Sequence, residues 1–502
     1  MNPQFAELKN RLAEIHDLTM IGWMLTWDQR TMMPPRGGAV RAEQIATLVK
    51  TSFEKFTDPA IGHLLDDLRP FEATLPFDDD AASLIRVARR DYAKAVKVPP
   101  ALRAEMERTA ALAQQAWAQA KQENDFARFL PHLERSVDLK RQYIECLDDG
   151  QSEAYDFLLD DYEPAMKTAE VATIFSELKQ ELIPLIAAIR EHAGAVSDAC
   201  LHGHFPAEQQ KAFCWRVIEQ LGANHASWRL DPTVHPFASS SATQDVRITS
   251  RYPEDFLNAA LFGTLHEFGH GLYEHQVSPA LERTPLCAGA SLGLHESQSR
   301  MWENLVGRSR PFWQFLYPQL QAAYPAQFGG VPLETFYRAI NKVQPSFIRI
   351  EADEATYALH IILRFELEQE MIAGKIALKD LPAVWNTRFY EYFGLMVPND
   401  ALGVLQDIHW SAGLIGYFPT YALGNIIGAQ IWEKVRADIP ALDEQFTRGE
   451  FSPLREWLRL HLHQHGRKYT PVDSLHRVVG GPIDVKPFVG YLKNKYSEIY
   501  GL

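Results

Sequence analysis

Residues 253–276 read PEDFLNAALFGTLHEFGHGLYEHQ, and this stretch decides how the fold is interpreted. Pro253, Glu254 and Asp255 are typical of the first turn of a helix, and apolar residues then follow on all sides of the predicted axis. A helix that is apolar all round is a buried helix. Inside it lies an H-E-x-x-H motif, HEFGH at 266–270. Buried imidazole and carboxylate groups need partners, so this helix is predicted to carry a site.

The H-E-x-x-H motif predicts a metal ion. Residues four apart lie on one face of a helix, so the imidazoles of His266 and His270 can reach the same ion. Glu267 lies one step round the axis, where it can hold a reacting water without being a ligand. The motif also arises by chance in a chain with 18 histidines and 64 acidic residues, but its place in a buried helix argues against chance. We therefore expect a zinc-type metallopeptidase site.

A third protein ligand has to come from another segment. Glu274 continues the same helix face, but eight residues of helix span about 12 Å, too far for metal bonds of about 2 Å. The further glycine and histidine of metzincins are absent from the positions that follow the motif. Glu296, in the predicted helix at 291–308, is the candidate, and Glu282, in the intervening link, is the weaker one. Three protein ligands leave one position open, which is typical of catalytic metal sites.

Composition restricts the possible partners. The chain of 502 residues has 46% hydrophobic and 23% charged residues, as ordinary soluble globular proteins do. Its net charge of −14 and the lack of a basic block argue against nucleic acid. Four cysteines without C-x-x-C spacing favour a reducing compartment, which we take to be the cytoplasm. Residues 408–432 lack charged side chains but contain proline, asparagine and glycine, so we expect buried interior near a site and no membrane partner.

Helical periodicity dominates the rest of the chain. We predict a mainly α fold: a large single helical body, residues 1–502, with an active-site cleft and a small β-sheet beside the metal-binding helix. An N-terminal helical portion of about residues 1–230 is expected to cover the cleft, followed by a metal-site portion of about 231–430 and C-terminal helices at about 431–502. The expected helices are 3–27, 39–56, 59–74, 80–97, 100–124, 126–147, 164–194, 207–221, 332–341, 353–372, 381–393, 425–439 and 453–463.

Strand signals are few. Residues 244–252 (QDVRITSRY) alternate apolar and polar side chains and predict a short half-buried strand. The preceding residues 233–244 are expected to form a loop that leads into it. Residues 288–293 are a possible partner strand.

Four further segments carry polar side chains that are unusual for a plain core, namely DVRIT at 245–249, FIRIEADEATY at 347–357, GVLQDIHW at 403–410 and GYFPTY at 416–421. Each has a structural alternative. Arg247 and Arg349 are most simply partners of nearby acids in ion pairs: Asp245 for Arg247, and Glu351 or Asp353 for Arg349. His409 alone is more often a hydrogen-bonded core histidine, and the aromatic residues are more often packing residues.

The motifs taken together resemble those of the M32 metallocarboxypeptidases, the thermostable carboxypeptidase group, nearly end to end. HEFGH matches the family's H-E-x-x-H, and HESQ at 295–298 matches its H-E-S/G-Q. DVRIT, IRIEAD at 348–353 and GVLQDIHW match D-x-R-x-T, I-R-x-x-A-D and G-x-x-Q-D-x-H-W, and HPF at 235–237 and LTWDQRTMMPPRGG at 25–38 also resemble the family. The resemblance agrees with His266, His270 and Glu296 as ligands.

The resemblance implies a helical fold with a cleft, a small sheet at the site and a homodimer. It implies an enzyme that removes single C-terminal amino acids with broad specificity from peptides with a free C-terminus. It further implies one divalent metal per chain, zinc in our expectation, with cobalt possible as an activator.

The roles of the remaining residues are expectations of the same kind. Glu267 is expected to act as general base, while His409 and a tyrosine, Tyr421 or Tyr417, donate to the oxyanion of the tetrahedral intermediate.

Removal of a C-terminal residue also requires a cation for the free α-carboxylate. Arg349 is the first choice, because a planar guanidinium can bind both oxygens, and Arg247 either shares the role or braces its strand. Asp353 and Glu303 are expected to orient the ligand imidazoles.

Two alternatives remain. An oligopeptidase would cut inside short peptides with the same metal motif, and the presence of a carboxylate-binding arginine decides between the two enzymes. A helical binding protein with a structural metal is disfavoured by the intact Glu267 and by the open coordination position.

Overall fold

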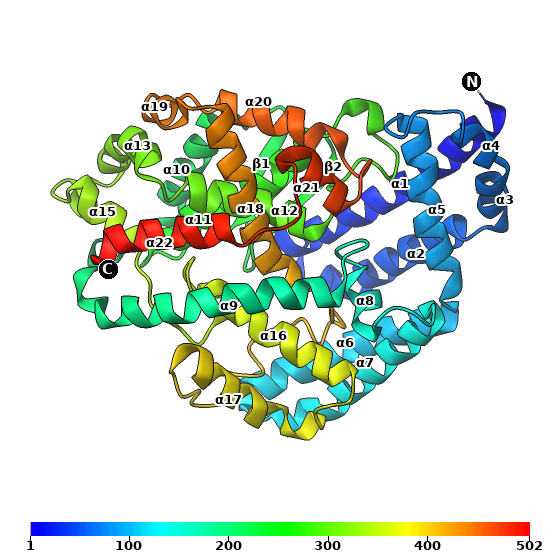
Figure 1. Cartoon of the computed structure of the whole chain (residues 1–502), viewed down its shortest axis with the longest axis horizontal. Coiled ribbons are helices and arrows are strands. Elements are labelled where there is room, and N and C mark those ends of the chain that lie inside the picture. The colour runs from blue at the N-terminus through cyan, green and yellow to red at the C-terminus, as the bar shows by residue number, and fades with distance from the viewer. Residues whose placement is uncertain (1) are drawn as a thin grey trace. The chain divides into compact units, whose positions relative to one another are not determined.

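Helices make up most of the computed structural model, which describes residues 2–502 (Figure 1). The prediction of a mainly α fold with one small sheet is confirmed. The chain forms two compact units, each assembled from three stretches: up to Val96, Ser197–Ile340 and Ile431–Pro482 in the first, and Lys97–Val196, Asn341–Gln430 and Ile483–Leu502 in the second. Each unit combines early and late segments of the chain, and the single body with its three portions in chain order stays a prediction.

The first unit contains the sheet and the H-E-x-x-H helix. Its elements are α1 (Pro3–Thr31), α2 (Gly38–Phe56), α3 (Pro59–Asp67), α4 (Arg69–Glu72), α5 (Asp80–Lys97, which ends at the boundary), α10 (Ala207–Gln220), β1 (Trp228–Pro232), β2 (Ala238–Ala242), β3 (Asp245–Ser250), α11 (Leu257–His275), α12 (Leu292–Arg300), the π-helical turn Met301–Val306, α13 (Arg310–Ala323), α14 (Pro325–Phe328), α15 (Leu333–Ile340), α19 (Leu442–Thr447), α20 (Ser452–His461) and α21 (Pro471–Val479).

The second unit is helical throughout its regular elements. These are α6 (Pro100–Glu123), α7 (Phe126–Leu147), α8 (Ala154–Leu159), α9 (Thr168–Glu191), α16 (Tyr357–Ile372), α17 (Leu381–Phe393) and α22 (Lys486–Tyr500). Helix α18 (Pro419–Asp438) begins in the second unit and ends in the first. It starts six residues before the predicted helix at 425–439, because Pro419 fixes the first turn. Helices α8, α13, α14, α19, α21 and α22 were not predicted.

The sheet has the strand order β1-β3-β2, with β3 in the centre. The predicted strand at 244–252 is confirmed as β3, but the prediction that 288–293 pairs with it is wrong. β3 pairs in parallel with β1, where Trp228 lies opposite Val246, and antiparallel with β2. β2 lies inside the predicted loop and reads ASSSA, so it has no apolar alternation by which a strand is recognised.

Two glycines let α11 pack closely on both of its neighbours. A Cβ at Gly269 would lie 2.4 Å from the carbonyl oxygen of Gln298 and 2.6 Å from the Cα of Ser299, so α11 and α12 touch backbone to backbone. A Cβ at Gly271 would lie 2.7 Å from side-chain atoms of Trp228 and Val246 in the sheet. Only glycine permits such approaches. The ligand helix is therefore held between the sheet and α12.

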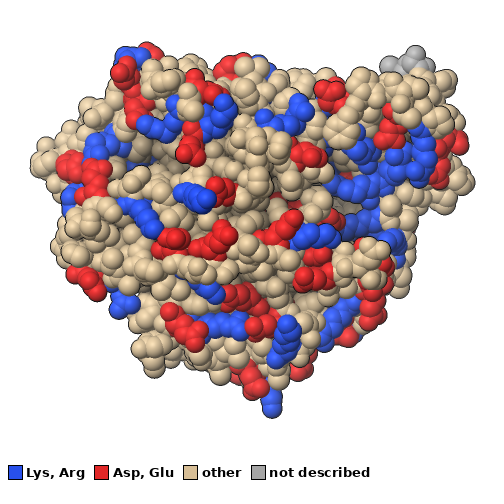
Figure 2. All heavy atoms as spheres, in the orientation of Figure 1, with Lys and Arg blue, Asp and Glu red and all other residues tan. Residues whose placement is uncertain are grey.

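The surface is mixed in charge, and acidic and basic side chains are interspersed over most of the face drawn in Figure 2. Among the described residues, no helix has both the length and the apolar character needed to cross a membrane.

In the second unit, one buried carboxylate anchors the irregular segment 394–418 that joins α17 to α18. Glu368 on α16 is fully buried and accepts hydrogen bonds from the Tyr155 hydroxyl at 2.7 Å, the Trp410 indole N–H at 2.8 Å and the Gly416 backbone N–H at 2.9 Å. Burial, only partly offset by these donors, raises the pKa of Glu368 to about 7. The segment without regular structure is thus fixed at Trp410 and Gly416 by a single side chain.

The raised pKa of Glu368 predicts how stability depends on pH. An acid whose pKa is raised by folding stabilises the folded state fully at low pH, and this contribution is lost as pH rises through 7. At about 1.4 kcal/mol per pKa unit, the loss amounts to about 3 kcal/mol. Glu368→Gln cannot ionise, so its unfolding free energy relative to wild type should increase from pH 5 to pH 8, as measured by urea denaturation.

Glu370→Gln is the matched control, because Glu370 lies on the same helix but pairs with Arg388 and is only partly buried. A difference between Glu368→Gln and wild type that is constant or falls with pH would show that the three donors hold Glu368 ionised in the folded protein.

Candidate metal centre

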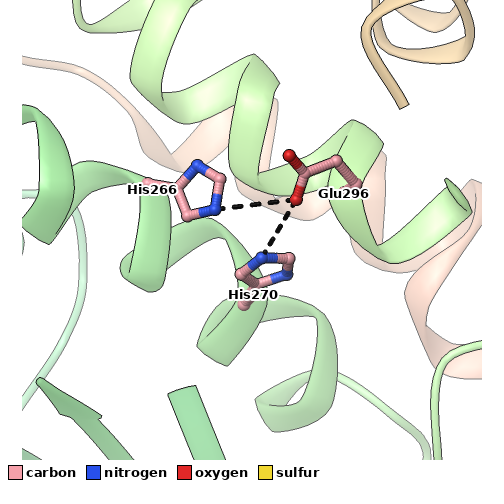
Figure 3. A group of neighbouring side chains, drawn as sticks. All are labelled: His266, His270 and Glu296. Carbon is pink, nitrogen blue, oxygen red and sulfur yellow. Dashed lines mark ion pairs between the residues drawn. The ribbon is translucent and has the colours of Figure 1, made fainter. Parts of the chain in front are cut away.

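His266, His270 and Glu296 converge in the first unit (Figure 3). Within residues 2–502, they form a group of potential ligands whose nitrogen and oxygen atoms all lie within 4.8 Å of one another. The Oε2 atom of Glu296 lies 3.6 Å from Nε2 of His266 and 3.3 Å from Nε2 of His270. The structure thus places the predicted third ligand on α12, facing the two histidines of α11. Glu282, the weaker candidate, instead accepts hydrogen bonds from Thr243.

The arrangement fits a divalent cation of the zinc type. Four ligands in a tetrahedron with bonds of 2.0–2.2 Å lie about 3.3 Å from one another, close to the two separations observed here. Burial lowers the pKa of His270 to about 3, so its imidazole is neutral and can offer a lone pair. Against the effect of burial, Arg300 and the two histidines hold the pKa of Glu296 below its usual range, so this ligand is a carboxylate.

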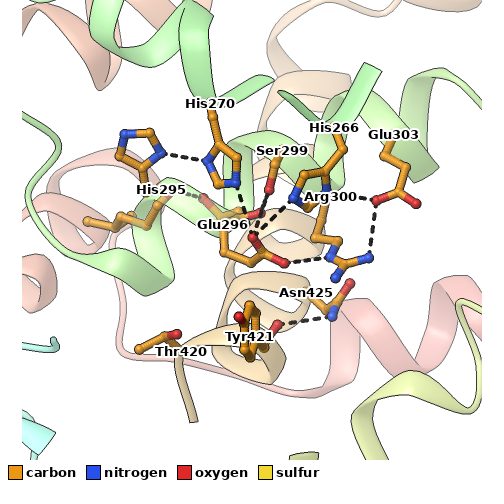
Figure 4. A network of polar contacts seen from close by, with 12 residues as sticks. His266, His270, His295, Glu296, Ser299, Arg300, Glu303, Thr420, Tyr421 and Asn425 are labelled. Carbon is orange, nitrogen blue, oxygen red and sulfur yellow. Dashed lines mark hydrogen bonds and ion pairs between the residues drawn. The ribbon is translucent and has the colours of Figure 1, made fainter. Parts of the chain in front are cut away.

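An arginine that the sequence interpretation missed organises the acidic groups. Arg300, four residues after Glu296 on α12, contacts Oε1 of Glu296 with its Nε at 2.7 Å and Oε2 of Glu303 with its Nη1 at 3.1 Å (Figure 4). It occupies one oxygen of Glu296 and leaves Oε2 facing the histidines. The spacing of four residues between Glu296 and Arg300 was the signal that could have indicated the pair.

Glu303 lies where the sequence predicted a residue that orients a ligand. Its Oε2 is 2.9 Å from Nδ1 of His266, on the opposite side of the ring from the Nε2 that faces Glu296. Although burial alone would lower it, the carboxylates of Glu296 and Glu303 raise the pKa of His266.

The other residue predicted to orient a ligand imidazole, Asp353, has different contacts. It accepts from the backbone N–H groups of residues 344, 355 and 356 and from the hydroxyl of Thr356, and so fixes the turn that precedes α16.

Glu267 follows the first ligand on α11 and is buried, with 6% of its surface exposed. Burial raises the pKa of Glu267 to about 7, against the opposing effect of His266. A carboxyl group with such a pKa can take up and release a proton near neutral pH, as a general base must.

Arg349 lies in a buried cluster of the second unit. Its Nε and Nη2 both lie 2.9 Å from Oδ1 of Asp407, and Nε of Arg364 lies 2.7 Å from the other oxygen, Oδ2. The structural alternative weighed for Arg349, an ion pair with Glu351 or Asp353, named the wrong partner. Asp407 lies 58 positions away in the chain, and no local spacing indicates such a pair. One carboxylate is thus shared by two buried guanidinium groups.

The other predicted residues of the second unit join this cluster. Nε2 of His409 lies 3.1 Å from the hydroxyl of Tyr421, and the rings of Tyr417 and Tyr421 lie 5.2 Å apart. The guanidinium carbon of Arg349 lies 4.9 Å from the centre of the Tyr421 ring. Burial, reinforced by Arg349, lowers the pKa of His409 to about 3, so its imidazole is neutral. The structure therefore brings together Arg349, His409 and both candidate tyrosines.

Arg247 has the contacts of an ion pair that braces its strand. Its Nε and Nη2 each lie 2.8 Å from one oxygen of Asp245, two residues earlier on β3, and its guanidinium carbon lies 4.7 Å from the centre of the Trp27 ring. This is the structural alternative for DVRIT.

Comparison with known proteins identifies the family. The family model described as Carboxypeptidase Taq (M32) metallopeptidase matches residues 7–496. Thermostable carboxypeptidase 1 of Thermus thermophilus is 40% identical over 492 residues, 96% of each chain, and carboxypeptidase 1 of Bacillus subtilis is 38% identical over 497 residues, 99% of this chain and 98% of that one.

Solved structures agree as well. The M32 carboxypeptidase of Deinococcus radiodurans superposes with a TM-score of 0.96 at 39% identity over the whole of both chains. A carboxypeptidase of Pyrococcus furiosus superposes with a TM-score of 0.95 at 35% identity over 99% of both chains. The chain therefore belongs to the Carboxypeptidase Taq (M32) metallopeptidase family and is a metal-dependent carboxypeptidase.

Proposed function

We propose that this carboxypeptidase has broad specificity and removes amino acids one at a time from peptides with a free C-terminus. It uses a zinc ion held by His266, His270 and Glu296, and cobalt can replace zinc as an activator. The observation that carries the proposal is the spacing of the three ligand atoms, with Glu267 beside them. When bound, the cation acidifies a water molecule and polarises the scissile carbonyl group.

Glu267 moves the proton in this proposal. Its carboxylate accepts a proton from the attacking water, and the resulting carboxyl group then gives it to the amine that leaves. Its burial supports this role, because burial favours the protonated carboxyl group that forms once the proton has been taken up.

His409 and Tyr421 are proposed to donate hydrogen bonds to the oxyanion of the tetrahedral intermediate. Each has a single hydrogen-bond donor, and in the 3.1 Å contact between them one donates to the other, so this contact has to open for both to donate to the oxyanion. Such a donor is worth about 10²–10³ in kcat. Tyr417, beside Tyr421, is proposed to hold that ring in place.

Arg349 is proposed to bind the α-carboxylate of the substrate. Two guanidinium groups share the single carboxylate of Asp407, so the buried cluster retains a positive charge that an anionic group can neutralise. Arg247, already paired with Asp245 through both ends of its guanidinium, is proposed to brace β3 and to take no part in binding.

The first test uses one peptide in three forms, namely with free ends, N-acetylated and C-amidated, followed by mass spectrometry. We expect stepwise loss of C-terminal residues from the first two forms and none from the amide. Glu267→Gln should retain zinc by elemental analysis but lose at least 10²-fold in kcat, because general acid–base catalysis is worth about 10²–10⁴. Glu282→Gln, a carboxylate that contacts Thr243, should match wild type in both measurements.

Three outcomes would change the assignment. Internal cleavage of all three forms would make the protein an oligopeptidase. Bound zinc without cleavage would favour a binding protein. Full turnover by Glu267→Gln would remove Glu267 as the base.

A second test separates carboxylate binding from structural pairing. Arg349→Gln should lose the preference for a free acid over an amide and fall roughly 30-fold or more in kcat/KM on the free acid, since removing one partner of a buried charge pair costs about 2–5 kcal/mol. Arg364→Gln, which breaks the same cluster at Asp407, should lower the unfolding temperature but keep the preference. Equal loss of the preference in both variants would indicate that Arg349 serves only to pair with Asp407.

We further propose a homodimer in the cytoplasm. The family resemblance supports the dimer, and the four cysteines, all free in the described structure, agree with a reducing compartment. Light scattering should give a mass of twice 57.0 kDa, and a mass of one chain would contradict the dimer. Cell fractionation tests the location.

A further inference from the structure

The Nδ1 atoms of the two ligand imidazoles have different hydrogen-bond partners. His266 meets a carboxylate directly, because its Nδ1 lies 2.9 Å from Oε2 of Glu303. His270 meets another imidazole, because its Nδ1 lies 2.6 Å from Nδ1 of His295 (Figure 4). Nε2 of His295 in turn lies 2.6 Å from Oε1 of Glu274. A line of hydrogen bonds thus leads from the second ligand through His295 to Glu274.

The chemistry of imidazole places the protons along this line. A neutral imidazole has one N–H donor and one nitrogen acceptor. A ligand that offers Nε2 to a metal carries its proton on Nδ1, so His270 donates from Nδ1 to Nδ1 of His295. His295 then carries its own proton on Nε2, from which it donates to the carboxylate of Glu274. The tautomer of His270 thus fixes the tautomer of His295.

Packing keeps His295 in this orientation. A Cβ at Gly289 would lie 2.6 Å from Cδ2 of His295, so the glycine backbone lies directly against the ring. The Gly289 N–H donates to Oε1 of Glu274 at 3.3 Å, and the ring of Tyr273 lies 5.2 Å from that of His295. His295 and Glu274 are mostly buried, with 18% and 21% of their side chains exposed.

We propose that His295 and Glu274 are positioning residues of the metal centre, which hold the proton of His270 on Nδ1 so that Nε2 presents its lone pair to the ion. The proposal rests on the ligand set proposed above. Glu274 lies four residues after His270 on the same face of α11, too far away to be a ligand itself, and His295 from α12 bridges that distance. Outer partners of this kind typically contribute 10–100-fold to metal affinity.

The test is the dissociation constant of Zn²⁺, measured by competition with a chelator on the full chain. His295→Leu removes the acceptor for the Nδ1–H of His270 and should weaken binding about 10–100-fold. His295→Asn places an amide oxygen near the position of Nδ1, so it should restore part of the affinity. The visible spectrum of the Co²⁺-loaded protein should change in His295→Leu and return toward wild type in His295→Asn.

A double-mutant cycle tests whether Glu274 acts through His295. Glu274→Ala should weaken Zn²⁺ binding in the wild-type background but change nothing further in the His295→Leu background, because the link to His270 is already broken. Additive effects would show that Glu274 acts by its charge alone. They would contradict the proposal that Glu274 acts on His270 through His295.

His463→Phe is the matched control. The ring centres of His463 and Tyr273 lie 4.7 Å apart, and the two ring nitrogens of His463 hydrogen-bond to Gln276 and Gln298. His463 is therefore a buried imidazole that packs on the same tyrosine as His295 but bonds to none of the three ligands. The Zn²⁺ affinity of His463→Phe should equal that of wild type. An unchanged affinity in both His295→Leu and Glu274→Ala, or an equal loss in His463→Phe, would refute the positioning role. Unfolding of the metal-free variants, followed by circular dichroism, separates loss of fold from loss of affinity.

Glu296→Ala separates this proposal from the ligand set on which it rests. If Glu296→Ala loses Zn²⁺ while His295→Leu keeps it, the positioning role of His295 and Glu274 is wrong but the ligand set stands. If Glu296→Ala keeps Zn²⁺ at wild-type affinity, the proposed ligand set fails first.

Discussion

The backbone contact between α11 and α12 at Gly269 is the constraint on which the metal centre depends. Two histidines four residues apart fix one side of a site, but a third ligand 26 residues further along the chain has to be brought within about 3.3 Å of both for a tetrahedral ion. Any Cβ at position 269 would collide with the backbone of α12. The second glycine of the helix, Gly271, does the same against the sheet, so α11 is fixed on two sides.

Buried charges are balanced differently in the two units. In the first, Arg300 lies between Glu296 and Glu303, and Arg308 lies 3.9 Å from Glu303, so two carboxylates face two guanidinium groups. The ligand set there is marked by the convergence of three ligand atoms and not by an excess of charge. In the second, Arg349 and Arg364 outnumber Asp407, and an excess of buried positive charge favours an anion. That imbalance, and not the mere presence of charges, indicates what kind of group the cluster of the second unit accepts.

A perturbed pKa by itself does not identify a catalytic group here. Burial raises the pKa of both Glu267 and Glu368 to about 7. Glu368 receives three donors from its own unit and fixes an irregular segment, whereas Glu267 stands beside the ligands. What distinguishes them is the surroundings: a carboxylate surrounded by fixed donors is a structural anchor, and one beside an open metal position can exchange its proton.

The sequence by itself determined the features that depend on local spacing. The helix repeat placed His266 and His270 on one face, periodicity predicted most of the helices, and the ordered motifs indicated the family. Only the tertiary structure decided the contacts between distant segments: Asp407 as partner of Arg349, β1 and β2 as partners of β3, Arg300 between two carboxylates, and His295 between His270 and Glu274. The physical reason is that a helix or strand has a fixed repeat that side chains must follow, whereas two segments brought together by packing share no repeat, and their register is set by the shapes and charges that meet.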